Sequence, residues 1–512
     1  MRKKALIFAI ICTMLFSFAA CGSEQVNITG EPVDDAYRNY YEIFVYSFSD
    51  FDGDGYGDIL GMTEKLDYVK EMGFNGIWLM PIMPSPSYHK YDVTDYYSID
   101  PLYGTMDEFR DFLDAAHERG INVIIDLVLN HTSSQNPWFK SAVYEENSPY
   151  REWYNFSDKA KSGYSSVNGE YYEARFTSTM PDLNLDNEEV RAEIEKIMDF
   201  WLTDVGVDGF RLDACTNYYT GSVKKNVEFL TWVENTARKY KEDVFIVGEV
   251  WENIYTIGQY CQSEVDSLFT FPYAQSSGYL AKLLGSTAKN TGKNLATAVE
   301  EVEKLYGDTM PAPFFANHDT DRTASILGTK SLPKLKMGAG LIAMMSGSTF
   351  VYYGDEIGMT GSENDPNKRI AMYWNDEELT ENPPGTTYAK YKLACVDEQL
   401  EDPDSLLNYY KAAYNLRAAV PEIARGESEI VSQDNSEVCV IKRTWKGKTV
   451  YIVINLNKEE SVITTADFAE NLEILGTLYS DPEAGKVAYK KGALTMPYWS
   501  IAVLSADYEI EE

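Results

Sequence analysis

Residues 209–214 read GFRLDA, and this hexapeptide decides how the middle of the chain folds. It is a short apolar run that carries two opposite charges, Arg211 and Asp213, two positions apart. A helical pattern over 186–206 precedes it, and a second one over 227–240 comes after it. A short apolar run between two helices is typical of a parallel sheet, whose strands are buried on both faces. Because side chains alternate along a strand, Arg211 and Asp213 are expected to point to the same side.

The alternation of apolar runs and helical stretches extends in both directions from this strand. One helical pattern covers 63–73, and another covers 105–120, where Thr105 and Glu108 form a capping box. Eight strand-like runs occur in all: 41–48, 76–81, 122–131, 208–214, 244–251, 267–273, 311–319 and 348–356. Eight strands that alternate with helices predict an α/β fold, a (β/α)8 TIM barrel.

Two parts of the chain interrupt this alternation. Residues 132–185 come after the third strand, lack helical periodicity and are rich in Tyr, Ser and Asn, which predicts a B domain inserted at the C-terminal rim of the barrel. From residue 428 the pattern becomes all β, which predicts a C-terminal antiparallel β-sandwich domain over 428–512. The catalytic barrel then consists of residues 39–131 and 186–427.

Composition excludes some classes of protein. The chain has 512 residues, of which 44% are hydrophobic, and this excludes a disordered chain. Its net charge of −35 would repel a phosphate backbone, so no nucleic acid is expected as a partner. Tyrosines and tryptophans number 38 and nine, and their flat faces could stack on sugar rings, although most could equally fill the core. We expect a monomer.

The N-terminus has the pattern of an export signal. Three basic residues at 2–4 precede the apolar stretch 5–20, which is too short for a membrane span, and the stretch ends in FAAC. Residues 1–20 therefore resemble a lipoprotein signal peptide, with Cys21 lipidated as the first mature residue and 21–38 as a linker. The expected location is the extracellular cell surface, with ordinary secretion as the alternative. The other cysteines have no spacing of a metal site and are interpreted as buried apolar residues: Cys215, Cys261, Cys395 and Cys439.

Polar residues gather at the ends of the predicted strands, and these ends share one rim of a barrel. Asp213 lies beside Arg211, which favours and orients an ionised carboxylate suited to act as a nucleophile. Glu249 lies between apolar Val247 and Trp251, so burial could keep it protonated. An ionised and a protonated carboxyl group about 5 Å apart are what retaining glycoside hydrolysis requires. The alternative is that each residue is a buried ion pair or a strand cap. The set is Asp126, Asn130, His131, Arg211, Asp213, Glu249, His318 and Asp319.

With these residues identified, the chain resembles the α-amylase family of (β/α)8-barrel glycoside hydrolases. DLVLNH, GFRLDA, GEVW and FFANHD look like that family's four main sequence regions, and GIWLMP, MPDLN and YYGDEIG look like its auxiliary ones. The resemblance implies Asp213 as nucleophile, Glu249 as general acid/base and Asp319 as transition-state stabiliser. It also implies six sugar ligands: Tyr91, His131, Arg211, His318, Asp365 and Arg369.

Some positions bear on specificity. Tyr88 and His89 precede Tyr91 in an amylase-like pattern, which predicts an α-amylase that cleaves internal α-1,4 bonds of starch and maltooligosaccharides. MPDLN (180–184) lies between the α-1,6-glucosidase and neopullulanase patterns. Neopullulanase, cyclomaltodextrinase, α-1,6-glucosidase and transglycosylase activities therefore remain alternatives, and a non-catalytic glucan-binding protein is a further one. Thr216 and Asn217 replace the Lys-His pair that many family members carry after the nucleophile.

The stretch DFDGDGYGD (50–58) predicts a metal site. Closely spaced carboxylates bind a hard cation or repel one another, and oxygen ligands on a glycine-rich loop suit Ca²⁺. The loop is not an EF-hand, because its twelfth position is Gly61. The expected ligands are Asp50, Asp52, Asp54, Asp58 and the Tyr56 carbonyl, and the alternative is a solvated acidic turn. The resemblance also leaves open a second ion near Asn130 and Asp182, but Asn217 in place of the usual histidine argues against it.

Overall fold

The computed structural model describes residues 33–465, 468 and 471–508. Eight parallel strands form the barrel, each paired with its neighbours in chain order from β1 to β10, and β11 pairs with β1. Two backbone hydrogen bonds, Ser348 N to Pro311 O at 3.0 Å and Phe350 N to Pro313 O at 2.9 Å, join the remaining edges. The predicted (β/α)8 barrel is therefore confirmed. Its strands are β1 (Asn39–Ile43), β2 (Gly76–Leu79), β3 (Asn122–Leu127), β7 (Gly209–Leu212), β8 (Phe245–Gly248), β9 (Ser267–Phe269), β10 (Met310–Ala312) and β11 (Thr349–Tyr352).

The strands are shorter than the apolar runs predicted for them. The run 311–319 contributes only two residues to β10, because Pro311 and Pro313 have no N–H to donate to a neighbouring strand. The run 41–48 ends as a strand at Ile43 and continues as a 3-10 turn over Val45–Ser47. Each strand leads into a loop at the C-terminal rim, and these loops carry the polar residues of interest.

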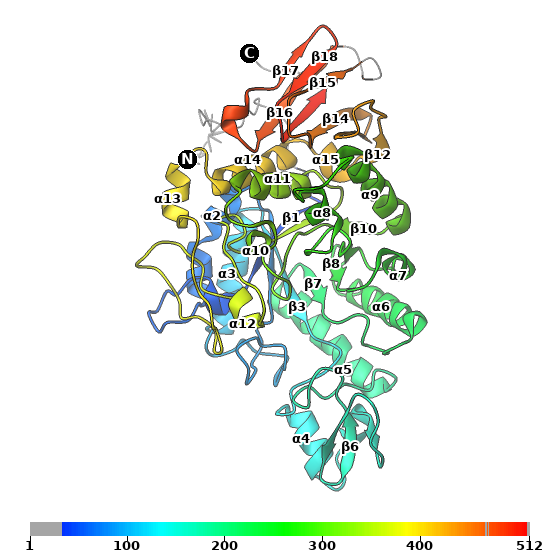
Figure 1. The fold of residues 1–512 in the computed structure, drawn as a ribbon. Coiled ribbons are helices and arrows are strands. Elements are labelled where there is room, and N and C mark those ends of the chain that lie inside the picture. The colour runs from blue at the N-terminus through cyan, green and yellow to red at the C-terminus, as the bar shows by residue number, and fades with distance from the viewer. Residues whose placement is uncertain (1–32, 466–467, 469–470, 509–512) are drawn as a thin grey trace, which may run out of the picture.

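Helices surround the barrel (Figure 1). The capping box predicted for the helix α3 (Met106–Glu118) is present. Thr105 Oγ1 accepts from Glu108 N, and the Glu108 carboxylate accepts from Thr105 N. The predicted helix over 63–73 is divided at Lys65 into two short helices. The surrounding helices are α1 (Ile59–Glu64), α2 (Leu66–Glu71), α3 (Met106–Glu118), α5 (Glu188–Asp199), α6 (Val223–Ala237), α7 (Ile254–Tyr260), α8 (Tyr279–Leu283), α9 (Thr291–Tyr306), α10 (Thr323–Leu327), α11 (Leu332–Ala343) and α14 (Leu406–Ala419).

Aromatic side chains fill the inside of the barrel. Tyr40 stacks on Phe245 at 5.2 Å and on Phe350 at 4.7 Å between ring centroids. Gly76 makes room for this ring, since a Cβ there would come within 2.6 Å of the Tyr40 ring. The barrel is therefore a packed core and not a pore, and only its C-terminal rim is open for chemistry.

Between β3 and α5 the chain leaves the barrel and forms a small separate sheet, seen at the lower end of Figure 1. Asp182 pairs with His131 in an isolated bridge and connects this part to the rim. We propose the bounds 132–185 for this inserted part. Its elements are α4 (Pro137–Tyr144), β4 (Phe156–Ser157), β5 (Tyr164–Val167) and β6 (Glu170–Glu173).

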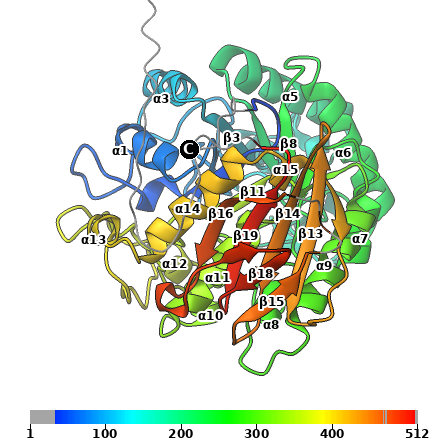
Figure 2. The same ribbon diagram turned by 90° about the horizontal axis from the view of Figure 1, so that it is seen from above.

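The C-terminal region consists of two antiparallel sheets, as predicted for a β-sandwich. Figure 2 looks onto the larger sheet, which lies across the end of the barrel opposite the inserted part. One face of this sheet packs into the main core through Ile441 and Ile452, and the other packs on the small sheet through Val440 and Val453. The sheets contain β12 (Glu427–Ile430), β13 (Val438–Trp445), β14 (Lys448–Asn455), β16 (Glu473–Tyr479) and β19 (Ser500–Ser505), and β15 (Ser461–Thr464), β17 (Ala488–Lys490) and β18 (Ala493–Met496).

Three short helices complete the elements that bear on the site and the termini: α12 (Asp365–Lys368), α13 (Val396–Glu401) and α15 (Glu422–Arg425). Among the described residues, no helix combines the length and the apolar character needed to cross a membrane. The predicted signal peptide 1–20, Cys21 and most of the linker lie outside the described residues.

Candidate active site

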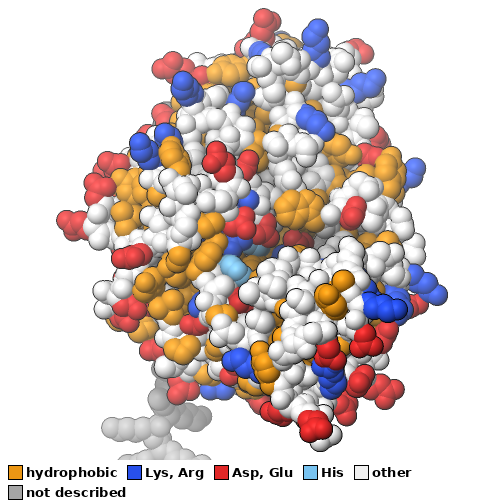
Figure 3. Space-filling view, turned by 60° about the horizontal axis from the view of Figure 1, so that its bottom comes forward, with side chains coloured by type: hydrophobic (Ala, Val, Ile, Leu, Met, Phe, Trp, Pro, Cys, Tyr) orange, Lys and Arg blue, Asp and Glu red, His pale blue; other side chains and the backbone are white. Residues whose placement is uncertain are grey.

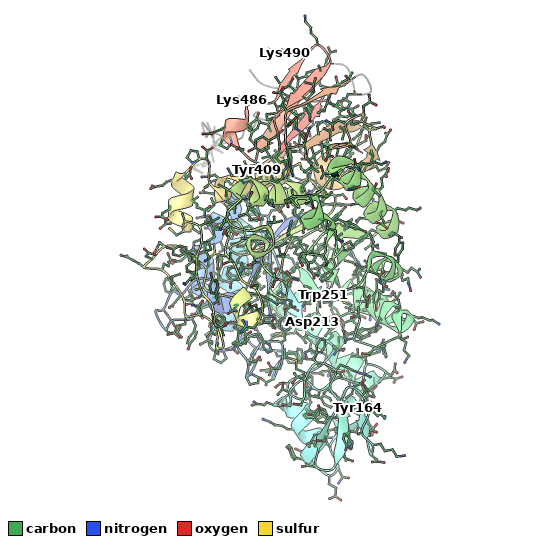
Figure 4. The ribbon with its side chains drawn as sticks, in the orientation of Figure 1. Tyr164, Asp213, Trp251, Tyr409, Lys486 and Lys490 are labelled. Carbon is green, nitrogen blue, oxygen red and sulfur yellow. The ribbon has the colours of Figure 1, made fainter. Side chains whose placement is uncertain are left out.

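The C-terminal rim of the barrel opens into a hollow between the barrel and the inserted part. In Figure 3 acidic, basic and histidine side chains gather in this hollow beside hydrophobic ones. Figure 4 shows Asp213 and Trp251 at this end of the barrel. The polar residues predicted to share one rim do so, because they lie at or just beyond the C-terminal ends of strands of one parallel sheet.

Arg211 is the centre of the site and is fully buried. Its Nη1 donates to both carboxylate oxygens of Asp126 at 2.9 Å and to Asp213 Oδ1 at 2.8 Å. Its Nη2 lies 3.1 Å from Glu249 Oε2. One guanidinium group therefore holds three carboxyl groups from three neighbouring strands, and this sharing brings Asp213 and Glu249 close together.

Glu249 comes directly after β8, and only 8% of its surface is exposed. Its Oε2 accepts a hydrogen bond from Ala214 N at 2.9 Å, and Ala214 has a positive φ of 51°. Burial raises the pKa of the Glu249 carboxyl above its usual value, Arg211 opposes the rise, and the carboxylates of Asp213 and Asp319 add to it. The carboxyl group is thereby shifted toward the protonated form, as a general acid requires.

Asp319 lies on the loop after β10, and 31% of its side chain is exposed. Arg369 Nη2 donates to its Oδ1 at 2.7 Å, and His318 Nε2 lies 3.1 Å from its Oδ2. Burial would raise the pKa of Asp319, but the positive charges of His318 and Arg369 outweigh burial and hold the pKa well below its usual range. Asp319 is therefore an anion with an open side toward the hollow.

Tyr91 connects the charged residues around Arg211 with those around Asp319. Its hydroxyl donates to Asp126 Oδ2 at 2.9 Å and lies 2.7 Å from His318 Nε2. Its ring stacks on the His318 ring at 5.5 Å with an angle of 15° between the planes. Both rings are buried, and the hydroxyl of Tyr91 is used within the protein.

His131 lies at the start of the inserted part and is 2% exposed. Its Nδ1 lies 3.3 Å from Asn130 Nδ2, and its Nε2 has no hydrogen-bond partner among the described residues. Burial lowers the pKa of His131, which favours the neutral ring. A buried ring nitrogen without a partner is costly unless a ligand satisfies it, so this atom is available to a sugar hydroxyl.

The Asp365–Arg369 pair is looser than the sequence suggests. Arg369 Nη2 is 4.0 Å from Asp365 Oδ2, whereas it is 2.7 Å from Asp319 Oδ1. Asp365 instead contacts Lys368 Nζ at 3.1 Å, and its side chain is 55% exposed. Lys368 Nζ also donates to the Asp319 carbonyl at 2.7 Å. Arg369 therefore belongs to the catalytic centre, and Asp365 lies at its edge.

The acidic loop lies outside this rim. Carboxylate oxygens of Asp50, Asp52 and Asp58 lie within 4.8 Å of one another, and the three could hold a metal ion. The same carboxylates accept backbone N–H groups of the loop, including Gly53 N to Asp50 at 2.7 Å. Asp54 accepts from Tyr56 N at 2.8 Å and is not part of the three-residue cluster.

A three-carboxylate set with oxygen ligands only, on a loop with positive φ at Gly53 (81°) and Gly55 (95°), fits Ca²⁺. At the second place considered for an ion, near Asn130 and Asp182, the two side chains contact each other. Asn130 Nδ2 donates to Asp182 Oδ1 at 3.4 Å, and burial, together with Glu173, raises the pKa of Asp182 to about 7.

The structure adds residues that the sequence did not single out as functional. Glu42 on β1 is buried beside His318, and Lys368 fixes the backbone of Asp319. A carboxylate in the apolar strand YYEI was a visible signal for Glu42. Trp251 is 45% exposed and stacks on Phe271 at 5.1 Å, so its free face is open beside Glu249.

Comparison with known proteins agrees with this geometry. The family model for the α-amylase catalytic domain matches residues 42–426. Alpha-amylase 3 of Dictyoglomus thermophilum is 35% identical over 500 residues, which cover 95% of this chain and 96% of that protein. Probable oligo-1,6-glucosidase 2 of Bacillus subtilis is 31% identical over 508 residues, which cover 82% of this chain and 90% of that protein.

A solved structure is similar over nearly the whole chain. That of Eubacterium rectale Amy13B is 40% identical, has a TM-score of 0.89, and the match covers 94% of this chain and 98% of that one. The match to the catalytic-domain model spans most of the barrel strands described above, together with Asp213, Glu249 and Asp319. The chain therefore belongs to the α-amylase family of glycoside hydrolases.

Proposed function

We propose that the protein is a retaining glycoside hydrolase that cleaves internal α-1,4-glucosidic bonds of starch and maltooligosaccharides. The observation that carries the proposal is the pair of carboxyl groups, Asp213 and Glu249, at the two ends of the Arg211 guanidinium. Retaining hydrolysis needs two carboxyl groups close together and in different protonation states. Contact with Arg211 orients the Asp213 carboxylate, and burial shifts Glu249 toward its acid form.

In the proposed first step, an oxygen of Asp213 attacks the anomeric carbon of the bound glucose. The bond to the leaving oxygen breaks as Glu249 gives that oxygen its proton, which leaves a glycosyl ester on Asp213 and Glu249 as a carboxylate. In the second step Glu249 removes a proton from water, the water oxygen bonds to the anomeric carbon, and Asp213 leaves as a carboxylate. The configuration of the sugar is retained because two inversions occur.

Asp319 is the proposed stabiliser of the transition state, because an anion beside the sugar ring stabilises the positive charge that develops there. Tyr91 would offer its ring face to the sugar. His131 Nε2, which has no partner among the described residues, would bind a hydroxyl. The remaining proposed sugar ligands are Arg211, His318, Asp365 and Arg369.

Two observations bear on where the chain of glucose units is cut. His89 and Tyr88 lie beside the centre, with the Arg369 guanidinium 5.9 Å from the Tyr88 ring. This sequence pattern supports attack within a chain, and so does the similarity to Alpha-amylase 3. The similarity to an oligo-1,6-glucosidase, together with MPDLN, favours hydrolysis of α-1,6 bonds as the second candidate.

A time course of products from starch, pullulan and cyclodextrins tests the proposal. We expect the iodine colour of starch to fall faster than free glucose appears, and the first product to have the α configuration by NMR. Glucose as the main early product would contradict internal attack. An initial β product would contradict retention. Release of maltotriose from pullulan would favour the second candidate, because α-1,6 bonds join the maltotriose units of that polymer.

We also propose one structural Ca²⁺, bound by the carboxylates of Asp50, Asp52 and Asp58. The sequence also predicts Asp54 and the Tyr56 carbonyl as ligands, but Asp54 is not part of the three-carboxylate cluster. Asp58 also caps α1 by accepting from Gly61 N at 2.7 Å, so the ion would stabilise the connection between this loop and the first helix. The catalytic acids are on other loops, and the ion is assigned no chemical step.

For the location we propose a cell-surface lipoprotein anchored through Cys21, with secretion as the alternative, and a monomer. The described part of the linker is held by Arg425, whose Nε and Nη2 donate to Asp35 at 2.8 and 2.7 Å. Asp35 precedes β1, at the N-terminal end of the barrel strands. An anchor at this end would leave the catalytic rim facing away from the membrane and open to a polymer.

A further inference from the structure

Glu42 is a buried carboxylate inside the barrel that the mechanism above does not use. It lies on β1 two residues after Tyr40, so both side chains point into the barrel, and Glu42 is nearer the catalytic rim. Only 1% of its surface is exposed. A charged group this deeply buried is costly unless it is paired and hydrogen-bonded, so its partner indicates its role.

The partner of Glu42 is His318. Glu42 Oε1 lies 2.5 Å from His318 Nδ1, while Nε2 of the same ring lies 2.7 Å from the Tyr91 hydroxyl and 3.1 Å from Asp319 Oδ2. Both nitrogens of the ring therefore face oxygen atoms, and of these three groups only the Tyr91 hydroxyl has a proton that it could donate.

Tyr91 does not donate its proton to His318, because its hydroxyl donates to Asp126 instead. Tyr91 has one proton, and it donates that proton to Asp126 Oδ2 at 2.9 Å. Burial raises the pKa of Asp126 to about 7, but Arg211 donates to both of its oxygens and favours the carboxylate form, which acts as an acceptor only. The Tyr91 oxygen is then an acceptor toward His318, and Nε2 must carry a proton. Nδ1 must carry one as well, because it faces the Glu42 carboxylate.

Anions outnumber cations among the charges around His318. Anions face it from β1 (Glu42), from its own loop (Asp319) and, through Tyr91, from β3 (Asp126). Cations lie one step further away, Arg211 on β7 and Arg369 beside Asp319. Trp78 on β2 contributes only a ring edge, 5.6 Å away. Burial alone would lower the pKa of His318, but Asp319 and Glu42 raise it to about 9.

We propose that Glu42 is a positioning residue of this site: through Nδ1 it holds the His318 imidazole in its doubly protonated form, so that the Nε2 proton is directed at Asp319 and Tyr91. The proposal rests on the proposed function, since it assigns Asp319 a part in glycoside hydrolysis. A neutral ring with its proton on Nδ1 would turn the Nε2 lone pair toward the Asp319 carboxylate. Asp319 would then lose a donor and its fixed orientation.

The consequence is one continuous chain of contacts with a fixed direction. It runs from Glu42 through His318 and Tyr91 to Asp126, and through Arg211 to Asp213. Glu42 would thereby set the orientation of Asp319 directly through His318. Through the same chain of contacts it would also help to orient Arg211, which contacts the proposed nucleophile, and Glu42 itself would not touch the substrate.

The experiment reads the protonation of His318 directly. The chain has only four histidines, so ¹⁵N-histidine labelling gives a short spectrum, and a His318→Gln variant assigns the signal. We expect His318 to be doubly protonated from pH 5 to pH 8 in the wild type. In Glu42→Gln, whose amide oxygen still accepts from Nδ1 but carries no charge, His318 should lose one proton within this range.

A matched control is available in Glu356→Gln. Glu356 is also a fully buried carboxylate, and it accepts from the hydroxyls of Tyr41 and Tyr68 on the other side of β1. This variant should keep the wild-type His318 signals. Glu42→Asp, which keeps the charge, should also keep His318 doubly protonated.

Kinetics give the functional readout. With Glu42→Gln, kcat/KM relative to the wild type should fall roughly tenfold more at pH 8 than at pH 5, because His318 then loses a proton within this range. The Glu356→Gln profile should match the wild type in shape. If Glu42→Gln does not fold, the wild-type spectrum still decides, because a neutral His318 at pH 7 would overturn the proposal.

A Glu42→Gln variant with His318 still doubly protonated at pH 8 would overturn it too. These outcomes are separate from failure of the proposed function. A wild-type protein that cleaves no α-glucan would refute the proposed hydrolase, while the ¹⁵N signals would still show whether Glu42 controls the state of His318.

Discussion

At the scale of single residues, the site is organised by one guanidinium group shared among three carboxyl groups. Arg211 contacts Asp126, Asp213 and Glu249, yet these three differ in environment. Asp126 is fully buried and takes two bonds from Arg211, so it serves to orient that side chain. Burial and the neighbouring anions raise the pKa of Glu249, whereas its contact with Arg211 lowers it. Opposite protonation states can therefore coexist within one cluster.

The raised pKa of Glu249 makes a prediction about pH. Because the acid form is the one that donates a proton, activity should be present below its pKa and should be lost as pH rises through it. Burial is the first cause of the rise, so the alkaline limb of kcat should lie above 4.5, the ordinary glutamate value. A pH profile of kcat on maltooligosaccharides checks this, and an alkaline limb at or below 4.5 would contradict it.

Substitution of the same residue gives a second test. Glu249→Gln should lower kcat on starch by about 10²–10⁴-fold, which is the range that general acid catalysis contributes. The loss should be much smaller on a glycosyl fluoride, because fluoride leaves without a proton from the enzyme. Asp213→Asn should fail on both substrates. Equal losses on starch and fluoride for Glu249→Gln would contradict its assignment as the acid.

At the scale of elements, the barrel strands position some residues of the site and the loops that follow them position the others. Arg211 and Asp126 lie inside paired strands, in register with each other, so the sheet itself fixes their contact. Asp319 lies beyond the end of β10, and its place depends instead on His318, Lys368 and Arg369. The register of two paired strands fixes the first contact, whereas the second depends on how two distant loops pack.

The acidic loop allows a matched pair of variants. Asp52 and Asp54 each accept one backbone N–H, at 3.0 and 2.8 Å, but only Asp52 belongs to the three-carboxylate cluster. A ligand that binds only the folded protein raises the melting temperature. Asp52→Ala should therefore abolish the rise in melting temperature that Ca²⁺ produces after chelation, whereas Asp54→Ala should keep it.

Differential scanning fluorimetry with EDTA and then excess Ca²⁺ makes this measurement. Loss of the response in both variants would add Asp54 to the ligands, as the sequence of the loop predicts. No Ca²⁺ response in the wild type, with no calcium found by elemental analysis, would mean that the loop is a solvated acidic turn.

At the scale of the whole molecule, the barrel has two ends with different tasks. The inserted part lies at one end, and the C-terminal sheets lie at the other (Figure 1). The larger C-terminal sheet is buried on both faces, so it is part of the same hydrophobic core as the barrel helices. This arrangement leaves the end that carries Asp213, Glu249 and Asp319 uncovered by the C-terminal sheets.

The anchor prediction belongs to this scale. Cys21→Ser should move the protein from the membrane fraction to the soluble fraction, with hydrolysis per molecule unchanged, because the linker enters at the end away from the site. Cys261→Ser, at a half-buried cysteine elsewhere, should stay in the membrane fraction. Mass spectrometry of the mature N-terminus checks the lipid directly, and an unlipidated terminus near Cys21 would favour ordinary secretion.

The order of apolar runs and helical patterns was sufficient to predict the barrel and the C-terminal sheets. Hydrophobic periodicity is a local property, and eight strands that alternate with helices close in few ways. The same local reasoning placed Asp213 and Arg211 on one side of a strand, as the structure has them.

Tertiary structure alone decided which charges pair. Arg369 is four residues from Asp365, but it binds Asp319, which is 50 residues away, at 2.7 Å. Glu42 lies 276 residues from His318, so no spacing could connect them. Local pattern determines which face a side chain takes, whereas its partner is whichever group the closed barrel brings within about 3 Å. Electrostatic roles at this site therefore depend on closure of the barrel.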